Sequence, residues 1–349
     1  MTSVAFNPAA ELIGHCVAGW HVTERISTKN SSGGNFSFGY KAHDDNGNIV
    51  FLKALDYSQA FKNPATQIDV LNSMTSAYIF ERDLLAQCSK NRVRNVIRLL
   101  KDGAYKPNSN WPYAVNYLVM EMADGSARDM LSLNASLDTL WALKSLHGTA
   151  VAIQSLHNAN IAHQDIKPSN VLYFNDTNVS KIGDVGRASS LDVASQHDEY
   201  DFAGDSHYSP PEQLYRFVDS DWKKRRFSCD AYMFGNLVMT YFNGTSITVN
   251  MLNGLAPGLR PNMWGDEYTQ VLPHLLHVFN QVVDKFVDLD DQDLRKELMH
   301  MVTDLCHPDP LVRGDKKETG IQRYSLQRYI AKLDYLHNRY AYRIRSRIG

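Results

Sequence analysis

The chain has 349 residues, which is enough for two compact lobes or for one large domain with a full hydrophobic core. Its 36 basic and 38 acidic residues leave a formal net charge of -2, so no overall field favours nucleic acid or an acidic membrane surface. No apolar run approaches the roughly 20 residues of a membrane-spanning helix, and the N-terminus lacks a basic start followed by an apolar core. The sequence therefore predicts a cytoplasmic protein. Its four cysteines contain no C-x-x-C pair, which argues against a zinc site or a disulfide framework: Cys16, Cys88, Cys229 and Cys306.

The N-terminal part of the chain alternates strand patterns with turns. Residues 1–19 show no clear period, and we expect an arm or a short helix there. Residues 20–28 are typical of a strand, and a Ser/Gly-rich loop follows at 31–39. Residues 39–55 then predict a hairpin that turns at Asp45-Asn46-Gly47. Lys53 ends the second strand of this hairpin, a position where a solvated edge lysine is the commonest interpretation.

A long helical segment and two more strands come next. Residues 65–89 carry apolar side chains close to helical spacing, with Glu81 among them. Strand patterns follow at 95–100 and 115–120, and the second leads into Glu121-Met122. The next helix is predicted from Ser136 to Asn158, with Ser136 as its N-terminal cap.

The stretch from Ile161 to Gly186, IAHQDIKPSNVLYFNDTNVSKIGDVG, places three oxygen-bearing side chains in a suggestive order. They are Asp165, Asn170 and Asp184. Phosphoryl transfer needs a carboxylate that orients the attacking hydroxyl, and further oxygen ligands that hold magnesium against the phosphates. Lys167 would neutralise charge on the transferring group. Each piece alone is usually turn chemistry, but their order and spacing favour a phosphoryl-transfer site.

The C-terminal half is predicted to be helical after one polar loop. Residues 187–211, between Gly186 and Glu212, have the composition of a mobile surface loop. The loop leads into Glu212 through Ser-Pro-Pro. Asp230 opens an apolar helix through Tyr241, and further helices are expected at 271–287 and 294–305. Residues 324–348 are basic and aromatic at helical spacing, which indicates a helix that packs on the domain or binds a protein partner.

Together these motifs resemble those of serine/threonine protein kinases over roughly residues 20–335. The resemblance implies an α+β, bilobal fold with a small β-rich N-terminal lobe at 20–120, a hinge at 121–125 and a larger α-helical lobe at 126–335, followed by the basic helix end at 336–349. It implies ATP and Mg²⁺ as cofactors, with Mn²⁺ as an alternative metal. The reaction implied is transfer of the γ-phosphoryl group to serine or threonine hydroxyls of a protein substrate, with autophosphorylation.

The resemblance also implies individual roles in catalysis and structure. Asp165 and Lys167 would be catalytic, and Asn170 and Asp184 would hold the metal. Two structural expectations come from the same source. Asp230 would anchor the catalytic loop, with a helix cap as its simpler role, and Glu212 would pair with Arg313.

A second set of residues is expected to contact ATP. Lys53 would contact the α- and β-phosphates and pair with a helix glutamate, for which Glu81 is preferred over Asp69 and Asp83. The serines of the phosphate-covering loop, Ser31, Ser32 and Ser37, are also candidate acceptors for autophosphorylation. The full set expected to bind ATP is Ser32, Gly34, Ser37, Lys53, Glu81, Met120, Glu121 and Met122.

Some departures from the family pattern keep other functions open. Only Gly34 remains of the three loop glycines, Val185 replaces the usual phenylalanine, and Asp205 stands where a threonine is usual. These departures motivate the alternative of a nucleotide-binding pseudokinase. A small-molecule phosphotransferase of the aminoglycoside or choline type is a further alternative, but Lys167 argues against it. Gln164 replaces an arginine that many kinases pair with a phosphorylated loop, so we expect activity without phosphorylation of Ser189, Ser190 and Ser195.

Overall fold

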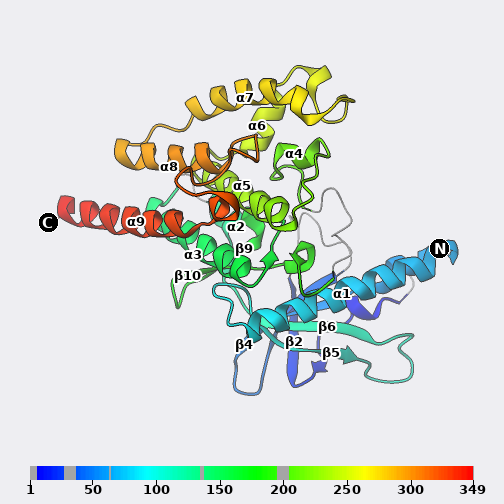
Figure 1. Ribbon diagram of the computed structural model, residues 1–349. Coiled ribbons are helices and arrows are strands. Elements are labelled where there is room, and N and C mark those ends of the chain that lie inside the picture. The colour runs from blue at the N-terminus through cyan, green and yellow to red at the C-terminus, as the bar shows by residue number, and fades with distance from the viewer. Residues whose placement is uncertain (1–5, 27–36, 63, 134–136, 195–203, 349) are drawn as a thin grey trace. The chain divides into compact units, whose positions relative to one another are not determined.

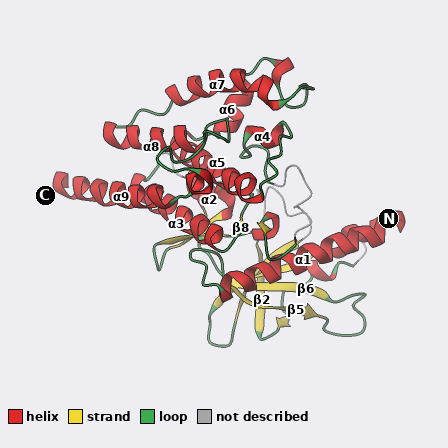
Figure 2. Cartoon of the chain, viewed as in Figure 1, coloured by secondary structure: helices red, strands yellow, loops and turns green. Residues whose placement is uncertain are grey.

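The computed structural model describes residues 6–26, 37–62, 64–133, 137–194 and 204–348. The chain divides into two compact units. The first comprises Met1–Arg92 and Ile97–Ala123, and the second comprises Val93–Val96 and Asp124–Gly349. The first unit is built on a β-sheet and the second is mostly helical (Figures 1 and 2). Among the described residues, no helix combines the length and the apolar character that crossing a membrane requires.

An antiparallel sheet forms the body of the first unit, and its described strands follow the order β1-β2-β3-β4-β6-β5. Strand β4 alternates exposed and buried side chains, so Val50, Leu52 and Ala54 share one face and enter the core. The long helix α1 packs against β5. The elements are β1 (Cys16–Val17), β2 (Trp20–Ile26), β3 (Ser37–His43), β4 (Ile49–Leu55), α1 (Gln67–Lys90), β5 (Leu99–Tyr105) and β6 (Val115–Glu121), with 3-10 helices η1 (Pro8–Ala10), η2 (Tyr57–Lys62) and η3 (Pro64–Thr66).

The described residues before Gly19 belong to this unit and do not form a separate arm. Ala9, Leu12 and Val17 are buried in the same core as the sheet residues. The hydroxyl of Tyr40 on β3 donates to the Ala9 carbonyl at 2.6 Å. Of the two expectations for residues 1–19, the short helix is present as η1, whereas the described residues do not form a separate arm because their apolar side chains enter the core of the sheet.

The β3–β4 hairpin confirms the predicted turn. Its strands pair from Ser37 opposite Leu55 to His43 opposite Ile49. At the turn, the Asp44 carboxylate accepts hydrogen bonds from the backbone N–H groups of Asn46 and Asn48, at 3.0 and 2.8 Å. Gly47 adopts a φ of +82°, which glycine tolerates without steric cost.

The predicted strand at 95–100 is displaced in the structure. Strand β5 begins at Leu99, while Asn95 has a left-handed φ of +56° and belongs to the second unit. Its side-chain amide donates to the carbonyls of Gly148 and Ser180, at 3.2 and 3.1 Å. Side-chain hydrogen bonds therefore hold Asn95 in the second unit, and a pattern of apolar residues does not reveal such contacts.

The second unit is organised around helix α5, which is buried from Arg226 to Tyr241. Helices α3, α6 and α8 pack against α5. The helices are α2 (Ala127–Leu133), α3 (Thr139–Asn158), α4 (Pro211–Leu214), α5 (Trp222–Asn243), α6 (Ile247–Gly254), α7 (Tyr268–Asp284), α8 (Gln292–Leu305) and α9 (Gln327–Ile348). The short elements are β7 (Gly125–Ser126), β8 (Ile161–Ala162), β9 (Val171–Phe174), β10 (Val179–Ile182) and β11 (Ser189–Ser190), with 3-10 helices η4 (Pro168–Asn170), η5 (Val185–Arg187), η6 (Pro257–Leu259) and η7 (Gly320–Tyr324).

Two helices begin at other residues than predicted. Helix α3 starts at Thr139, and its cap is Asp138, whose carboxylate accepts from Leu140 N–H at 2.9 Å. The predicted cap, Ser136, lies outside the described residues. Helix α5 starts at Trp222, capped by Asp221, so Asp230 lies in mid-helix and does not open it. The charged first turns of α5 concealed its start.

The C-terminal helix α9 packs on its own unit, which was one of the two expectations for it. It lies along α3 (Figure 1). Two of its basic side chains are used within the unit, because Arg339 and Arg343 each bind the Asp291 carboxylate at 2.8 Å. Asp291 also caps α8. Part of the basic character of α9 therefore joins two helices of the same unit.

Candidate active site

A cluster of three polar side chains lies in the loop between β8 and β9. Lys167 Nζ lies 2.9 Å from Asp165 Oδ2. Asn170 Nδ2 donates to the same oxygen at 3.1 Å and to the Asp165 carbonyl at 2.8 Å. All three residues are buried. The loop thus brings together Asp165, Lys167 and Asn170, as their spacing predicts, and it fixes the direction of the Asp165 carboxylate.

Asp230 holds the backbone of this loop from helix α5. Its carboxylate accepts from the backbone N–H groups of His163 and Gln164, at 2.7 and 2.8 Å. His157 Nε2 lies 2.9 Å from Asp230 Oδ2. Burial alone raises the pKa of Asp230, but the hydrogen bond and charge of His157, together with the Gln164 N–H, outweigh it and lower the pKa. The prediction that Asp230 anchors the loop is confirmed.

Asp184 follows strand β10, next to the cluster. The preceding Gly183 N–H donates to the Asn170 carbonyl at 2.9 Å, and His163 Nε2 lies 3.0 Å from the Gly183 carbonyl. A Cβ at Gly183 would lie 2.7 Å from Leu172 Cδ1, so a larger residue there would require the Leu172 side chain to shift. Asp184 itself has a left-handed φ of 53°. The β9–β10 hairpin therefore places Asn170 and Asp184 at the same end.

Opposing effects act on the pKa of the Asp165 carboxyl. Burial raises its pKa, the charge and hydrogen bond of Lys167 lower it, and the charge of Asp184 raises it again. The net pKa lies above its ordinary value. A carboxylate held this way is a better proton acceptor than an exposed one, while Lys167 keeps it from being protonated too readily.

The polar segment after β11 returns to this cluster at Gly204-Asp205. The Asp205 N–H donates to Asp165 Oδ1 at 3.0 Å. A Cβ at Gly204 would lie 2.2 Å from the Gln164 carbonyl, so a larger residue there would displace the segment. Both oxygens of the Asp165 carboxylate therefore have donors on fixed elements.

Two serines considered as phosphorylation sites are inaccessible in this fold. Ser189 and Ser190 form β11, which pairs with β8, and only 1% and 5% of their surfaces are exposed. Trp222 Nε1 donates to Ser189 Oγ at 3.1 Å. Ser195 lies outside the described residues.

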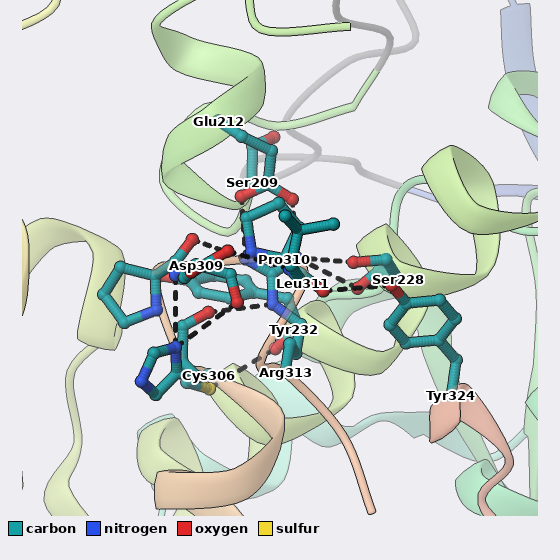
Figure 3. Close-up of polar contacts among 12 residues, drawn as sticks. Ser209, Glu212, Ser228, Tyr232, Cys306, Asp309, Pro310, Leu311, Arg313 and Tyr324 are labelled. Atoms are coloured by element: carbon teal, nitrogen blue, oxygen red, sulfur yellow. Dashed lines mark hydrogen bonds and ion pairs between the residues drawn. The ribbon is translucent and has the colours of Figure 1, made fainter. Parts of the chain in front are cut away.

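A buried ion pair fixes the end of the same segment, as predicted (Figure 3). Arg313 contacts both Glu212 oxygens, with Nη1 2.5 Å from Oε1 and Nη2 2.7 Å from Oε2. Arg313 Nη1 also donates to Ser228 Oγ at 2.9 Å, and its guanidinium carbon lies 4.8 Å from the centre of the Tyr232 ring. Burial lowers the pKa of Arg313, but Glu212 more than reverses this effect, so the guanidinium stays charged.

In the first unit, Lys53 on β4 pairs with Glu81 on α1. Lys53 Nζ lies 2.8 Å from each Glu81 oxygen. The Glu81 carboxylate is 9% exposed and the Lys53 side chain 21%, so the lysine is held at a partly buried position rather than at a solvated edge. The choice of Glu81 over Asp69 and Asp83 is confirmed.

The structure describes only some of the other residues expected to contact ATP. Ser32 and Gly34 lie outside the described residues, and Ser37 is the first residue of β3. Met120 is buried at the end of β6. The Glu121 N–H donates to the Arg98 carbonyl at 3.3 Å, and the Glu121 side chain accepts from Arg98 N–H. The Glu121 N–H therefore already donates to Arg98, the residue before β5, and is a poor candidate for donating to a purine.

Two residues that support the loop were missed by the sequence analysis. Arg226 is buried and donates to Gln164 Oε1 at 3.2 Å, while Gln164 Nε2 donates to the Arg226 carbonyl at 2.9 Å. His157 stacks on Phe227 with ring centres 3.9 Å apart. A basic run and a histidine at a helix end are usually surface features, so the sequence carried no signal for either role.

Comparison with known proteins agrees with this geometry. A family model described as "Protein kinase domain" matches residues 32–325, well over half of the chain. No curated protein sequence matches the chain. The matched range contains the Lys53–Glu81 pair of the β-rich unit, and the Asp165 cluster and Glu212–Arg313 pair of the helical unit. The chain therefore belongs to the protein kinase domain family, with its α+β architecture of a β-sheet N-terminal region and a helical C-terminal region.

Proposed function

We propose that this protein kinase is a serine/threonine kinase that transfers the γ-phosphoryl group of ATP to hydroxyls of a protein. The observation that carries the proposal is the buried Asp165 carboxylate, whose Oδ2 is held by Lys167 and Asn170 and whose Oδ1 is held by Asp205 N–H. A lysine two residues after the catalytic aspartate is what serine/threonine kinases carry.

In this proposal, Asp165 accepts the hydrogen bond of the acceptor hydroxyl and receives its proton as the phosphoryl group is transferred. The raised pKa that burial gives Asp165 suits that task. Lys167, ion-paired with Asp165, faces the same side and stabilises negative charge on the transferring group. Because these side chains are fixed before the substrate binds, little reorganisation is needed during the reaction.

The donor set at the end of the β9–β10 hairpin fits magnesium. Asn170 offers an amide oxygen and Asp184 a carboxylate, and both are hard oxygen ligands of the kind Mg²⁺ prefers; Mn²⁺ accepts the same set. The Gly183–Asn170 backbone hydrogen bond keeps the two residues at one end of the hairpin. When bound, the metal would neutralise phosphate charge.

The first unit would supply the nucleotide contacts. Lys53, oriented by Glu81, is proposed to bind the α- and β-phosphates. Met120 would pack against the adenine, with Met122 supplying backbone groups. Ser32, Gly34 and Ser37 would cover the phosphates. The hydroxyls of Ser31, Ser32 and Ser37 are candidates for autophosphorylation.

The proposal is tested by incubating the purified protein with γ-labelled ATP, Mg²⁺ and a panel of protein substrates, followed by phosphoamino-acid analysis. Label on serine or threonine, absent in Asp165→Asn, is the expected result. Label on tyrosine alone would refute the serine/threonine assignment. Nucleotide binding without label on any protein would indicate a pseudokinase, and label on an added small alcohol would indicate a small-molecule phosphotransferase.

A further inference from the structure

The segment that ends in Glu212 brings a second carboxylate to the catalytic lysine. Asp205 Oδ2 lies 3.8 Å from Lys167 Nζ. Asp165 Oδ2 lies 2.9 Å from the same nitrogen. The side chains of Lys167 and Asp205 are 5% and 14% exposed, so water screens their attraction only weakly. One ammonium group is therefore shared between two carboxylates.

The other oxygen of Asp205 is used within its own segment. Asp205 Oδ1 accepts from the His207 N–H at 3.0 Å and lies 2.9 Å from His207 Nδ1. The Asp205 N–H meanwhile holds Asp165 Oδ1. These contacts fix the carboxylate in place beside Lys167, so its approach is not a chance side-chain orientation.

Asp205 is ionised in this arrangement. Burial by itself raises its pKa, but the His207 N–H and imidazole, together with the charge of Lys167, outweigh burial and lower the pKa. A negative charge thus faces Lys167 permanently at neutral pH. A threonine at this position would add a hydroxyl and no charge.

We propose that Asp205 is an attenuating residue, which weakens phosphoryl transfer by neutralising part of the Lys167 charge that the transferring group requires. This inference rests on the proposed function, because it assigns Lys167 to that group. The backbone of the same residue positions Asp165, so the segment supports the catalytic carboxylate while its side chain limits the catalytic lysine. This kinase is then built for a low intrinsic rate that one substitution relieves.

The test is the steady-state kinetics of Asp205→Asn. The asparagine oxygen still accepts from His207 N–H, so the turn is kept and only the charge is removed. We expect kcat to rise about threefold to tenfold, as removing one partly buried charge near Lys167 warrants, with KM for ATP changed less than about twofold. Asp205→Thr should also raise kcat. The matched control is Asp219→Asn, which removes a carboxylate from an accessible turn where Asp219 Oδ1 accepts from Asp221 N–H at 2.8 Å; its kcat should equal that of wild type.

The pH profile separates this electrostatic effect from a merely structural one. The groups whose charges act on Asp165 are Lys167, Asp184 and His163, with Asp205 beside Lys167. Removing the Asp205 charge should lower the pKa of Asp165 and move the acidic limb of the kcat profile to lower pH. An unchanged or reduced kcat in a folded Asp205→Asn protein would overturn the inference.

The same kinetic data distinguish failure of the inference from failure of the proposed function. If the wild type transfers no phosphate to protein hydroxyls, the proposed function fails. If the wild type transfers phosphate but kcat does not rise in folded Asp205→Asn, the inference fails independently.

Discussion

At the scale of single residues, Asp165 combines its proposed catalytic role with a cost to stability. Because burial raises its pKa in the folded state, protonated Asp165 stabilises the fold at low pH, and this contribution is lost as pH rises through the folded-state pKa. Asp165→Asn should therefore reduce kcat by at least about 100-fold, since it removes the proton acceptor. Its melting temperature at neutral pH should equal or exceed that of wild type. A calorimetric melt and a rate assay on the same preparation check both, and a clear fall in melting temperature would show that ionised Asp165 stabilises the fold.

The Lys53–Glu81 pair allows a second prediction at this scale. Lys53→Met keeps much of the side-chain volume but removes the charge, so phosphoryl transfer should fall by about 100-fold or more. Glu81→Gln leaves Lys53 charged and only loosens its position, so its loss should be smaller, roughly tenfold. Steady-state kinetics with circular dichroism as a folding control distinguish the two. Equal losses in both variants, with both folded, would contradict the assignment of Lys53 to the phosphates.

At the scale of elements, the Glu212–Arg313 pair joins α4 to the loop before η7 in the helical unit. The Arg313 side chain is fully buried, and Arg313→Ala would leave the Glu212 carboxylate buried without its cation. We expect a loss of about 3 kcal/mol or more in the free energy of unfolding. Lys332→Ala is the control, because Lys332 and Glu297 form a 3.1 Å pair with about a third of each side chain exposed. Its cost should stay under about 1 kcal/mol in urea unfolding.

The elements also show what the sequence can and cannot predict. Apolar residues close to helical spacing located α1 and α7 to within a few residues, and the hairpin turn at Gly47 followed from glycine chemistry. The cluster of Asp165, Lys167 and Asn170 followed from motif spacing. The start of α5 and the site of Asn95 did not. Charged residues fill the first turn of α5, and side-chain hydrogen bonds to distant carbonyls specify the site of Asn95.

The same distinction applies to the site. Asp165, Lys167 and Asn170 are close in sequence, so a single loop brings them together. The sharing of Lys167 with Asp205 instead requires the chain to return from 38 residues away. No local pattern encodes such a return. The sequence could flag Asp205 as unusual, but only the fold shows which cation it faces.

At the scale of the whole molecule, the cysteines report on the two units separately. Cys16 is exposed, whereas Cys88 in the first unit and Cys229 and Cys306 in the second are buried. Burial raises the pKa of Cys88 to about 12 and raises the pKa values of Cys229 and Cys306 well above the ordinary range. A thiol that is neither exposed nor ionised reacts slowly with alkylating agents. Native protein treated with iodoacetamide near neutral pH should therefore be modified at Cys16 before the other three, as peptide mass spectrometry would show.

The order in which the buried thiols become reactive then tests where the Arg313 pair acts. Arg313 belongs to the second unit, and a compact unit can open without global unfolding. In Arg313→Ala, Cys229 and Cys306 should be alkylated at lower urea than in wild type, while the urea dependence of Cys88 should change less. Lys332→Ala should leave all three profiles close to wild type. If Cys88 became reactive at the same urea as Cys229 and Cys306 in Arg313→Ala, the pair would stabilise the molecule as one cooperative whole, and the assignment of its effect to the helical unit would be wrong.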